Sequence, residues 1–511
     1  MKHLSTLFAL LLLALGAAPA HAEPADIAAA ARSVVRVVLI AQDNGEFSLV
    51  GHGSGVAVGP NLILTNAHVV QPAQEADMIR IGVVPSEGKT GWFGQVVSVS
   101  PGNDLALIRI GENGALPAAT LFTGPVGDGA DVFAIGYPGN VDLAQGYDVG
   151  DLVTPTAPVK TRGNISAGRA SRQFDTLLHT APIGAGNSGG PLLDACGRVI
   201  GINSFGTVAD SGDSEFYFAV SMREVSRFLL SAGIKPHGSG APCRSIADLD
   251  RAEAERLAGE KALSDENARA LAAKAESARR EAQLDVIGRR ENGMALAGVA
   301  LLLALTAVGA AFLFTQKQNR RGAIAAGVVA ALLLGGGVVA WMTRPALATI
   351  DSPDGAAEAQ ASGTPSPAAG ALSGDLVCVL DPDRSRVTVS EGNDVPLSWR
   401  ADGCANGRTQ YALDAQGWSS LSVADGEDSA TVSRFDPATG TLRADRYLLG
   451  LEDMTRLRAA NQKLAAPACG GATGNGGANA ARDLASAQGA LRGLLPATPN
   501  ERLLYRCQKA K

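Results

Sequence analysis

Short runs of β-branched and other apolar residues, separated by Gly, Pro and Asn, characterise the first half of the chain. Between Ala28 and Ala232 they fall at residues 33–40, 54–58, 61–65, 105–110, 131–135 and 198–202. Runs of this length between turn residues are typical of β-strands. Residues 221–230 differ, because their pattern is helical and Ser221 is a suitable N-cap. The pattern therefore predicts an all-β domain that ends in a single helix.

Two longer apolar runs, residues 294–314 and 323–342, contain no charged residue. At about 1.5 Å per helical residue, each reaches about the 30 Å of a hydrocarbon core. We therefore predict two transmembrane helices. The basic residues Lys317, Arg320 and Arg321 favour a cytoplasmic turn over residues 315–322. The alternative, two buried helices of a globular core, is disfavoured because neither run has a polar face.

The residues before and between these features complete the predicted topology. Residues 1–22 have a basic start, an apolar centre and the ending Ala-His-Ala, as expected for a signal peptide cleaved before Glu23. A retained anchor is disfavoured because the apolar run is short for a bilayer. Residues 244–293 are rich in Ala, Glu and Arg with i,i+4 charge pairs, which predicts a charged helical stalk. The regions flanking the two spans are thus both expected in the periplasm or an equivalent extracytoplasmic space.

The end of the chain predicts a second folded domain. Residues 343–373 are rich in Ala, Pro, Ser and Gly and are typical of a flexible linker. Residues 374–511 then read as a small β-rich domain of unknown function, in which we recognise no catalytic motif. Its expected strands are residues 375–380, 386–389, 395–399, 430–435 and 441–448, and its expected helices lie near residues 451–464 and 480–491.

Composition limits the partners and the compartment. The chain has 511 residues, more than one core normally holds, and its formal net charge is −6. This balance offers no basic surplus for binding nucleic acid. In an exported protein the six cysteines are expected to be oxidised. Cys196 and Cys243 are expected to form a disulfide, with two separate thiols as the alternative. Four cysteines of the last domain can pair in three ways that the sequence does not rank: Cys378, Cys404, Cys469 and Cys507.

The segment Gly-Ala-Gly-Asn-Ser-Gly-Gly-Pro at residues 184–191 carries the main chemical signal. Glycines around Ser188 permit a tight backbone that exposes the hydroxyl and aims N–H groups at an oxyanion. His68 follows a predicted strand and Asp104 precedes another, so the chain supplies a base, a carboxylate and a nucleophile. Taken singly, His68 is more often a core histidine, Asp104 is more often a capping carboxylate, and the segment around Ser188 could be a plain loop. Their combination favours catalysis.

These three stretches, in this order and spacing, resemble the chymotrypsin-like serine proteases, and Gly-Asn-Ser-Gly-Gly resembles the HtrA (Deg) branch. The resemblance covers about residues 30–232. It implies two six-stranded β-barrels with the active site between them. It also implies Ser188 as nucleophile, His68 as general base and then acid, and Asp104 as the carboxylate that fixes the imidazole tautomer. The N–H groups of Gly186 and Ser188 would form the oxyanion hole. The residues implied to bind substrate are Pro182, Ser204, Phe205 and Gly206.

The chain also departs from the family pattern. Asn187 stands where trypsin-type enzymes have an Asp that pairs with a new amino terminus, so this activation is not expected. Pro182 stands where trypsin-like enzymes place an acid, which favours apolar side chains at P1. Most Deg-type proteases carry a peptide-binding PDZ module after the protease domain, whereas no such module is recognisable here. Three other histidines lack catalytic context: His52, His179 and His237.

The sequence thus predicts a membrane-anchored serine endopeptidase that hydrolyses exported proteins or peptides. No His/Cys spacing suggests zinc, and the chemistry requires neither a metal nor a cofactor. A catalytically silent scaffold that binds peptides or a partner is the alternative, and it would not need all three catalytic residues. Hydrolysis of a non-peptide ester fits less well, because residues 201–206 suit an extended backbone. The stalk's apolar positions are irregular, so self-association stays open.

Overall fold

The computed structural model describes residues 24–43, 46–111, 114–170, 174–207, 215–235, 238–343, 372–389, 392–424, 426–463, 469 and 476–510. The predicted signal peptide and most of the predicted linker lie outside these residues. The chain divides into two compact units. The first comprises Met1–Glu253 with Pro367–Lys511, and the second comprises Ala254–Ser366.

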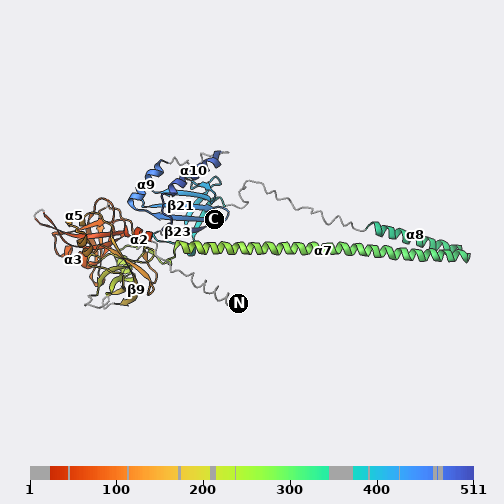
Figure 1. The fold of residues 1–511 in the computed structure, drawn as a ribbon, viewed down its shortest axis with the longest axis horizontal. Helices are drawn as coiled ribbons and strands as arrows, with labels where there is room; N and C mark the ends of the chain where they lie inside the picture. The colour runs from red at the N-terminus through yellow and green to blue at the C-terminus, as the bar shows by residue number, and fades with distance from the viewer. Residues whose placement is uncertain are drawn as a thin grey trace, which may run out of the picture. The chain divides into compact units, whose positions relative to one another are not determined.

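A closed six-stranded barrel forms the first half of the β-rich region (Figure 1). Alternate residues of its strands point inward, so that Val35 and Val37 of the first strand pack against Ile63 and Ile108. Helix α3 (Ala67–Glu75) follows the third strand directly. In barrel order the strands are β1 (Val34–Asp43), β2 (Glu46–Gly59), β3 (Leu62–Thr65), β6 (Leu105–Ile110), β5 (Trp92–Ser100) and β4 (Ile79–Pro85).

The second half is also a closed ring of six strands, with β7 (Leu121–Phe122) and β14 (Gly238–Ser239) extending the sheet beyond β12. Pairing of β11 with β12 closes this ring. The two rings confirm the predicted double barrel. In ring order the strands are β11 (Pro191–Leu193), β8 (Asp131–Gly136), β9 (Val159–Ala170), β10 (Asp175–His179), β13 (Tyr217–Ser221) and β12 (Val199–Gly206).

The prediction of a single helix in this region was wrong. Helix α6 (Met222–Ser231) is present with Ser221 at its N-cap, although the Ser221 side chain makes no capping hydrogen bond. The missed helices are too short for a helical apolar period to stand out, and α3 also contains Pro72. They are α2 (Pro24–Ala31), α3, α4 (Gly139–Gln145) and α5 (Val149–Leu152).

The last domain is a nine-stranded sheet with two helices, which confirms the predicted β-rich, disulfide-bonded domain. Trp399 is buried at its centre with its ring 4.7 Å from that of Phe435. Residues 386–389 do not form the expected strand, because Arg386 makes only an isolated bridge. In sheet order the strands are β18 (Thr409–Gln410), β17 (Cys404–Ala405), β16 (Val395–Trp399), β15 (Gly374–Leu380), β23 (Glu501–Lys509), β22 (Thr441–Leu448), β21 (Ser429–Asp436), β20 (Gly417–Val423) and β19 (Ala412–Asp414); the helices are α9 (Leu451–Gln462) and α10 (Gly476–Arg492).

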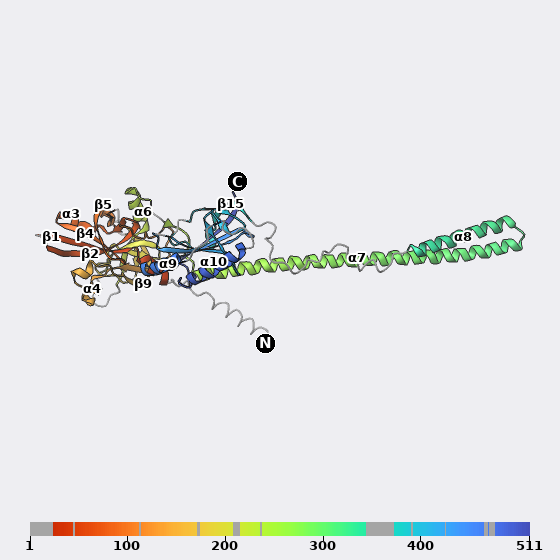
Figure 2. The same cartoon turned by 90° about the horizontal axis from the view of Figure 1, so that it is seen from above.

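Two long helices carry the apolar runs. Helix α7 (Ile246–Gln316) continues through the predicted stalk and the first apolar run without a break, and α8 (Arg320–Met342) follows. Figure 2 shows α8 alongside the C-terminal part of α7. Small residues line their contact, since a Cβ added at Gly337 would lie 3.4 Å from Cβ of Ala300. Both helices are long and apolar enough to cross a membrane.

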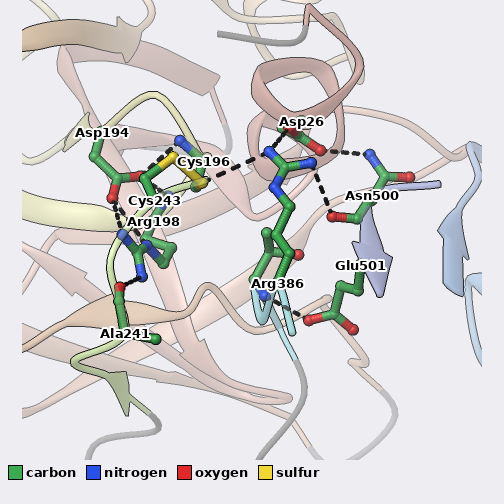
Figure 3. The surroundings of a disulfide bond; sticks show 10 residues. Asp26, Asp194, Cys196, Arg198, Ala241, Cys243, Arg386, Asn500 and Glu501 are labelled. Carbon is green, nitrogen blue, oxygen red and sulfur yellow. Dashed lines mark hydrogen bonds and ion pairs between the residues drawn. A yellow bond between two sulfur atoms is a disulfide. The ribbon is translucent and has the colours of Figure 1, made fainter. Parts of the chain in front are cut away.

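Within the first unit, a buried ion pair joins α2 to the last domain (Figure 3). The Arg386 guanidinium donates to the Asp26 carboxylate, and both residues are 3% exposed. Asn500 donates to the other Asp26 oxygen at 2.9 Å. Arg386 Nη2 also lies 3.6 Å from Sγ of Cys196, which forms a disulfide with Cys243. The C-terminal sheet is thus tied to the β-barrel region at a point that is closed to water.

We predict that Arg386→Ala lowers the unfolding free energy by about 3–5 kcal/mol, because it leaves the Asp26 carboxylate buried without its cation. Arg384→Ala is the control, since Arg384 pairs with Glu253 at a partly exposed site, where such a pair contributes about 0–1 kcal/mol. Urea unfolding of the detergent-solubilised chain, followed by tryptophan fluorescence, measures both. Equal losses in the two variants would contradict the prediction.

Candidate active site

His68 and Asp104 lie at neighbouring strand ends of the first barrel. His68 is in the first turn of α3, directly after β3, and Asp104 precedes β6, which pairs with β3. Both Asp104 carboxylate oxygens lie 3.0 Å from Nδ1 of His68, and the His68 backbone N–H donates to one of them at 3.1 Å. Asp104 has a left-handed backbone with φ of 53°, which is uncommon for a residue other than glycine. The side chain of Asn66 donates to its carbonyl at 2.8 Å and supports this turn.

Ser204 connects this pair to the second barrel. It lies at an irregularity of β12, where the pairing with β13 shifts register between Asn203 and Phe205. Such a bulge re-aims the side chain and carbonyl of the residue within it. The Ser204 hydroxyl donates to Asp104 Oδ2 at 2.5 Å, and its carbonyl accepts from Ser188 Oγ at 2.9 Å. One residue thereby links Ser188 to the carboxylate.

The Asp104 carboxylate is held in its charged form. Burial opposes the charge and by itself would raise the pKa of Asp104. Hydrogen bonds from His68 and Ser204 outweigh burial, and the net effect is a lowered pKa. Asp104 therefore stays ionised at neutral pH and can orient the imidazole of His68 by accepting from Nδ1.

The loop that carries Ser188 requires glycine at two positions. Gly186 and Gly189 have φ of 102° and 87°, in the region that disfavours other residues. A Cβ at Gly186 would lie 2.3 Å from the carbonyl oxygen of Tyr137, and one at Gly189 would lie 2.2 Å from that of Ser54. Within the described part of the chain, neither Gly186 N–H nor Ser188 N–H makes a hydrogen bond. Both donors are available to an oxyanion.

Ser188 and His68 are not joined in this structure. Among the described residues, Ser188 Oγ donates to Ser204 and no hydrogen bond links it to His68. The His68 side chain is 48% exposed, so its outer nitrogen is accessible. Catalytic hydrogen bonds are commonly loose before substrate binds. A rotation of the Ser188 side chain away from the Ser204 carbonyl is the step that would bring the hydroxyl to the base.

Comparison with known proteins gives the family of this site. Residues 53–202 match the model of the trypsin-like peptidase domain. The putative serine protease HhoA of Synechocystis is 35% identical over 198 residues, which are 38% of this chain and 46% of that protein. Serine protease PepD of Mycobacterium tuberculosis is 32% identical over 226 residues, 41% of this chain and 47% of that protein. Serine protease HTRA1 of Xenopus tropicalis is 35% identical over 184 residues, 35% of this chain and 36% of that protein.

The double-barrel region that contains residues 53–202 is an HtrA-type protease domain. It belongs to the chymotrypsin-like serine endopeptidases, as the sequence predicted. The chain spans less than half the length of each of these relatives, and the match leaves α7, α8 and the last domain outside it.

Three of the residues expected to bind substrate, Ser204, Phe205 and Gly206, lie at the end of β12, and Pro182 lies in the loop between β10 and β11. Phe205 is 44% exposed and stacks on Phe218 with ring centroids 4.8 Å apart. Gly206 pairs with Tyr217 across the sheet, and Pro182 is exposed before the Gly-rich loop. The nearby Glu215 carboxylate accepts from the hydroxyl of Tyr217. This acid is therefore engaged by Tyr217, and two further acids of the same segment, Asp210 and Asp213, lie outside the described residues.

Two histidines that the sequence set aside lie close to this machinery, whereas His237 is outside the described residues. His179 ends β10, is fully buried, and has its ring 6.0 Å from that of Tyr217. Burial lowers the pKa of His179 to about 4, against smaller opposite effects of Ala181 and Asn203. Burial likewise lowers the pKa of His52. The contacts of His52 and His179 form only when the barrels close, so no signal in the sequence marks these two histidines.

The described part of this region lacks the ligand set that a metal site needs. Among the residues that the structure describes, no group of three or more His, Cys, Asp and Glu side chains is placed to hold a metal ion. The polar groups described here are instead arranged as hydrogen-bond donors and acceptors around Ser188 and Asp104. This arrangement can support nucleophilic attack, proton transfer and oxyanion binding.

His179 predicts a stability change in acid. Because its pKa is about 4 in the folded domain and ordinarily 6.5, only the unfolded chain binds the proton between these values. Stability must therefore fall as pH drops from 6.5 to 4, by roughly 3 kcal/mol for this residue. We expect His179→Gln to flatten the dependence of the unfolding free energy on pH across that window. A slope equal to that of the parent chain in urea melts would contradict this.

Proposed function

We propose that the protein is a membrane-anchored serine endopeptidase that hydrolyses peptide bonds of exported proteins. The observation that carries the proposal is the set of hydrogen bonds at Asp104. Its carboxylate accepts from His68 and from Ser204, and the Ser204 carbonyl accepts from the Ser188 hydroxyl. The protease relatives cover only this domain, so the activity of the whole chain is part of the proposal.

The proposed reaction uses these groups in sequence. Ser188 Oγ leaves the Ser204 carbonyl and attacks the scissile carbonyl carbon, while Nε2 of His68 takes the hydroxyl proton. Asp104 accepts from Nδ1 and stabilises the imidazolium. The new oxyanion accepts hydrogen bonds from the N–H groups of Gly186 and Ser188. His68 then gives its proton to the leaving amine, and a water molecule repeats the cycle on the acyl-enzyme.

Two features support an exported substrate. All six cysteines are paired, as Cys196–Cys243, Cys378–Cys507 and Cys404–Cys469. Disulfides of this number are typical of oxidising compartments. The predicted signal peptide leads to the same compartment. We therefore propose protein substrates of the periplasm or an equivalent extracytoplasmic space, with apolar side chains at P1.

Membrane anchoring rests on α7 and α8. Their apolar runs leave large side chains uncovered, with Leu302 65% and Leu332 69% exposed. A continuous apolar surface of this kind is costly in water and is satisfied by lipid. The small residues between the helices, including Gly337 against Ala300, allow the close approach that is common between membrane helices.

A catalytically silent scaffold is the second candidate. The missing hydrogen bond between Ser188 and His68 is the observation that favours it. The N–H groups of Gly186 and Ser188, which make no hydrogen bond among the described residues, favour the enzyme instead, because a scaffold has no use for an oxyanion site.

A reactive-serine assay separates the two candidates. We expect a fluorophosphonate probe to label the detergent-solubilised parent at Ser188, and Ser188→Ala to abolish labelling and casein hydrolysis without changing the fold. Asp104→Asn should lower kcat on the order of 10⁴-fold by favouring the wrong His68 tautomer. Ser231→Ala, at the end of α6, is the control and should retain parent activity. An unlabelled parent would favour the scaffold, and casein hydrolysis by Ser188→Ala at the parent rate would contradict the assignment.

Fusions to alkaline phosphatase test the topology, because this enzyme is active only where its disulfides can form. With two spans and an exported protease domain, we expect a fusion after residue 373 to be active and a fusion at Asn319 to be inactive. The reverse pattern would overturn the topology and place the last four cysteines in a reducing compartment.

A further inference from the structure

We propose that Ser54 is a positioning residue of the oxyanion hole, whose buried hydroxyl holds the Gly186–Asn187 peptide and, together with the Gly139 bond to the Ala185–Gly186 peptide, restrains the backbone on both sides of Gly186 and so the direction of its N–H. The inference rests on the proposed proteolytic function and adds a residue outside the three catalytic side chains. Ser54 lies in β2 of the first barrel and is fully buried. Its hydroxyl therefore acts from within the protein and does not contact substrate.

The direction of each hydrogen bond at this hydroxyl is fixed. The backbone N–H of Tyr137 donates to Ser54 Oγ at 2.9 Å, and Ser54 Oγ lies 2.7 Å from the carbonyl oxygen of Gly186. Because a backbone N–H can only donate and a carbonyl can only accept, the single Ser54 proton goes to Gly186. The Ser54 hydroxyl thus accepts from Tyr137 and donates to Gly186, and the two hydrogen bonds cannot exchange direction.

Ser54 is itself rigidly mounted. Its backbone N–H donates to the carbonyl of Ser188 at 2.8 Å, and its own carbonyl accepts from Thr65 Oγ1 at 2.7 Å. The residue is therefore held by β3 on one side and by the nucleophile loop on the other. A side chain with this support can act as a fixed reference for the loop.

The peptide on the other side of Gly186 is also held. The N–H of Gly139 donates to the carbonyl of Ala185 at 2.8 Å. The carbonyl of Ala185 and the N–H of Gly186 belong to one peptide plane and point in opposite directions. With the Gly139 bond before Gly186 and the Ser54 bond after it, both planes that meet at this glycine are fixed. Such restraint matters because glycine alone permits many orientations.

A buried polar cluster supports the backbone that holds these two bonds. Nε2 of His52 donates to the Tyr137 carbonyl at 3.1 Å and lies 3.5 Å from Asp142. Asp142 forms an ion pair with Arg36 at 2.7 Å. The Arg36 guanidinium also stacks over the Tyr137 ring, 4.6 Å from its centroid. The strand end at Tyr137 is therefore anchored independently of Ser54.

A purely structural role for Ser54 makes a different prediction from a positioning role. Alanine keeps the Cβ and the packing but leaves the Gly186 carbonyl and the Tyr137 N–H without this partner, which costs stability in either case. Only the positioning role predicts a loss confined to the transition state, since the oxyanion forms after substrate has bound.

The experiment compares detergent-solubilised parent, Ser54→Ala and Ser33→Ala on a peptide substrate and on the matching peptide aldehyde. Ser33 is the matched control, because its buried hydroxyl donates to the Ala30 carbonyl at 2.7 Å and does not contact the nucleophile loop. The aldehyde forms a hemiacetal whose oxygen occupies the oxyanion hole. Removal of an oxyanion donor costs about 10²–10³ in kcat, and we expect Ser54→Ala, which only misaligns one, to lose about 10- to 100-fold.

The expected pattern is a lower kcat for Ser54→Ala with KM nearly unchanged, and an equal loss of aldehyde affinity. Ser33→Ala should keep the parent values for both. Ser54→Cys retains a weak donor at the same place and should fall between parent and Ser54→Ala, which keeps the test valid if the alanine variant does not fold. An active parent with unchanged kcat in the folded Ser54 variants overturns this inference alone. A parent that hydrolyses nothing overturns the proposed function and the inference with it.

Discussion

The hydrogen bond between Ser204 and Asp104 joins the two barrels at the catalytic centre. Asp104 comes from the first barrel and Ser204 from the second, so the geometry of His68 depends on how the barrels meet. Burial of the carboxylate is unfavourable, and the donors that surround it compensate. The carbonyl oxygen of the same residue, Ser204, accepts the hydrogen bond from the Ser188 hydroxyl. A shift between the barrels would therefore change the carboxylate and the nucleophile together.

Buried charges are also compensated by nearby partners where the last domain meets the HtrA-type domain. Arg198 is buried, pairs with Asp194 at 2.6 Å and lies over the Phe122 ring at 4.2 Å. It lies beside the Cys196–Cys243 disulfide that also neighbours the Arg386–Asp26 pair (Figure 3). Pairs of this kind add little net stability, because desolvation offsets their attraction. The Arg386–Asp26 pair penalises any arrangement that separates the last domain from α2, whereas Asp194 and Arg198 lie four residues apart within the HtrA-type domain and stabilise that segment alone.

The sequence revealed those elements whose signal is local. The hairpin of β21 and β22 and the strand β16 follow the predicted ranges because alternation and turn residues mark them. The pairing of Cys378 with Cys507 could not be ranked, because it depends on the register of β15 with β23, strands 129 residues apart in the chain. The continuity of α7 was also missed, since the change from charged to apolar composition concealed a single helix.

At the active site too, the sequence revealed the residues with a local pattern and missed those that depend on distant contacts. Glycines around a serine, with a histidine and an aspartate in family order, form a pattern that survives without coordinates. Ser54 has no such pattern, since a serine between two glycines is typical of any turn or strand end. Its role depends on Tyr137 and Gly186, which are 83 and 132 residues away in the chain. Contacts of this range arise only from barrel closure.

The loop around Ser188 is held without the charge that trypsin-type enzymes use. Asn187 occupies the position of their paired Asp and is buried. Its backbone N–H donates to the Gly184 carbonyl, and its carbonyl accepts from Gly190, each at 3.0 Å. A carboxylate buried here would need a cation to offset its desolvation, whereas the side-chain amide of Asn187 is neutral, and its Oδ1 makes no hydrogen bond among the described residues. The described backbone hydrogen bonds at Asn187 are therefore contacts between neutral groups, and none of them involves a charged amino terminus.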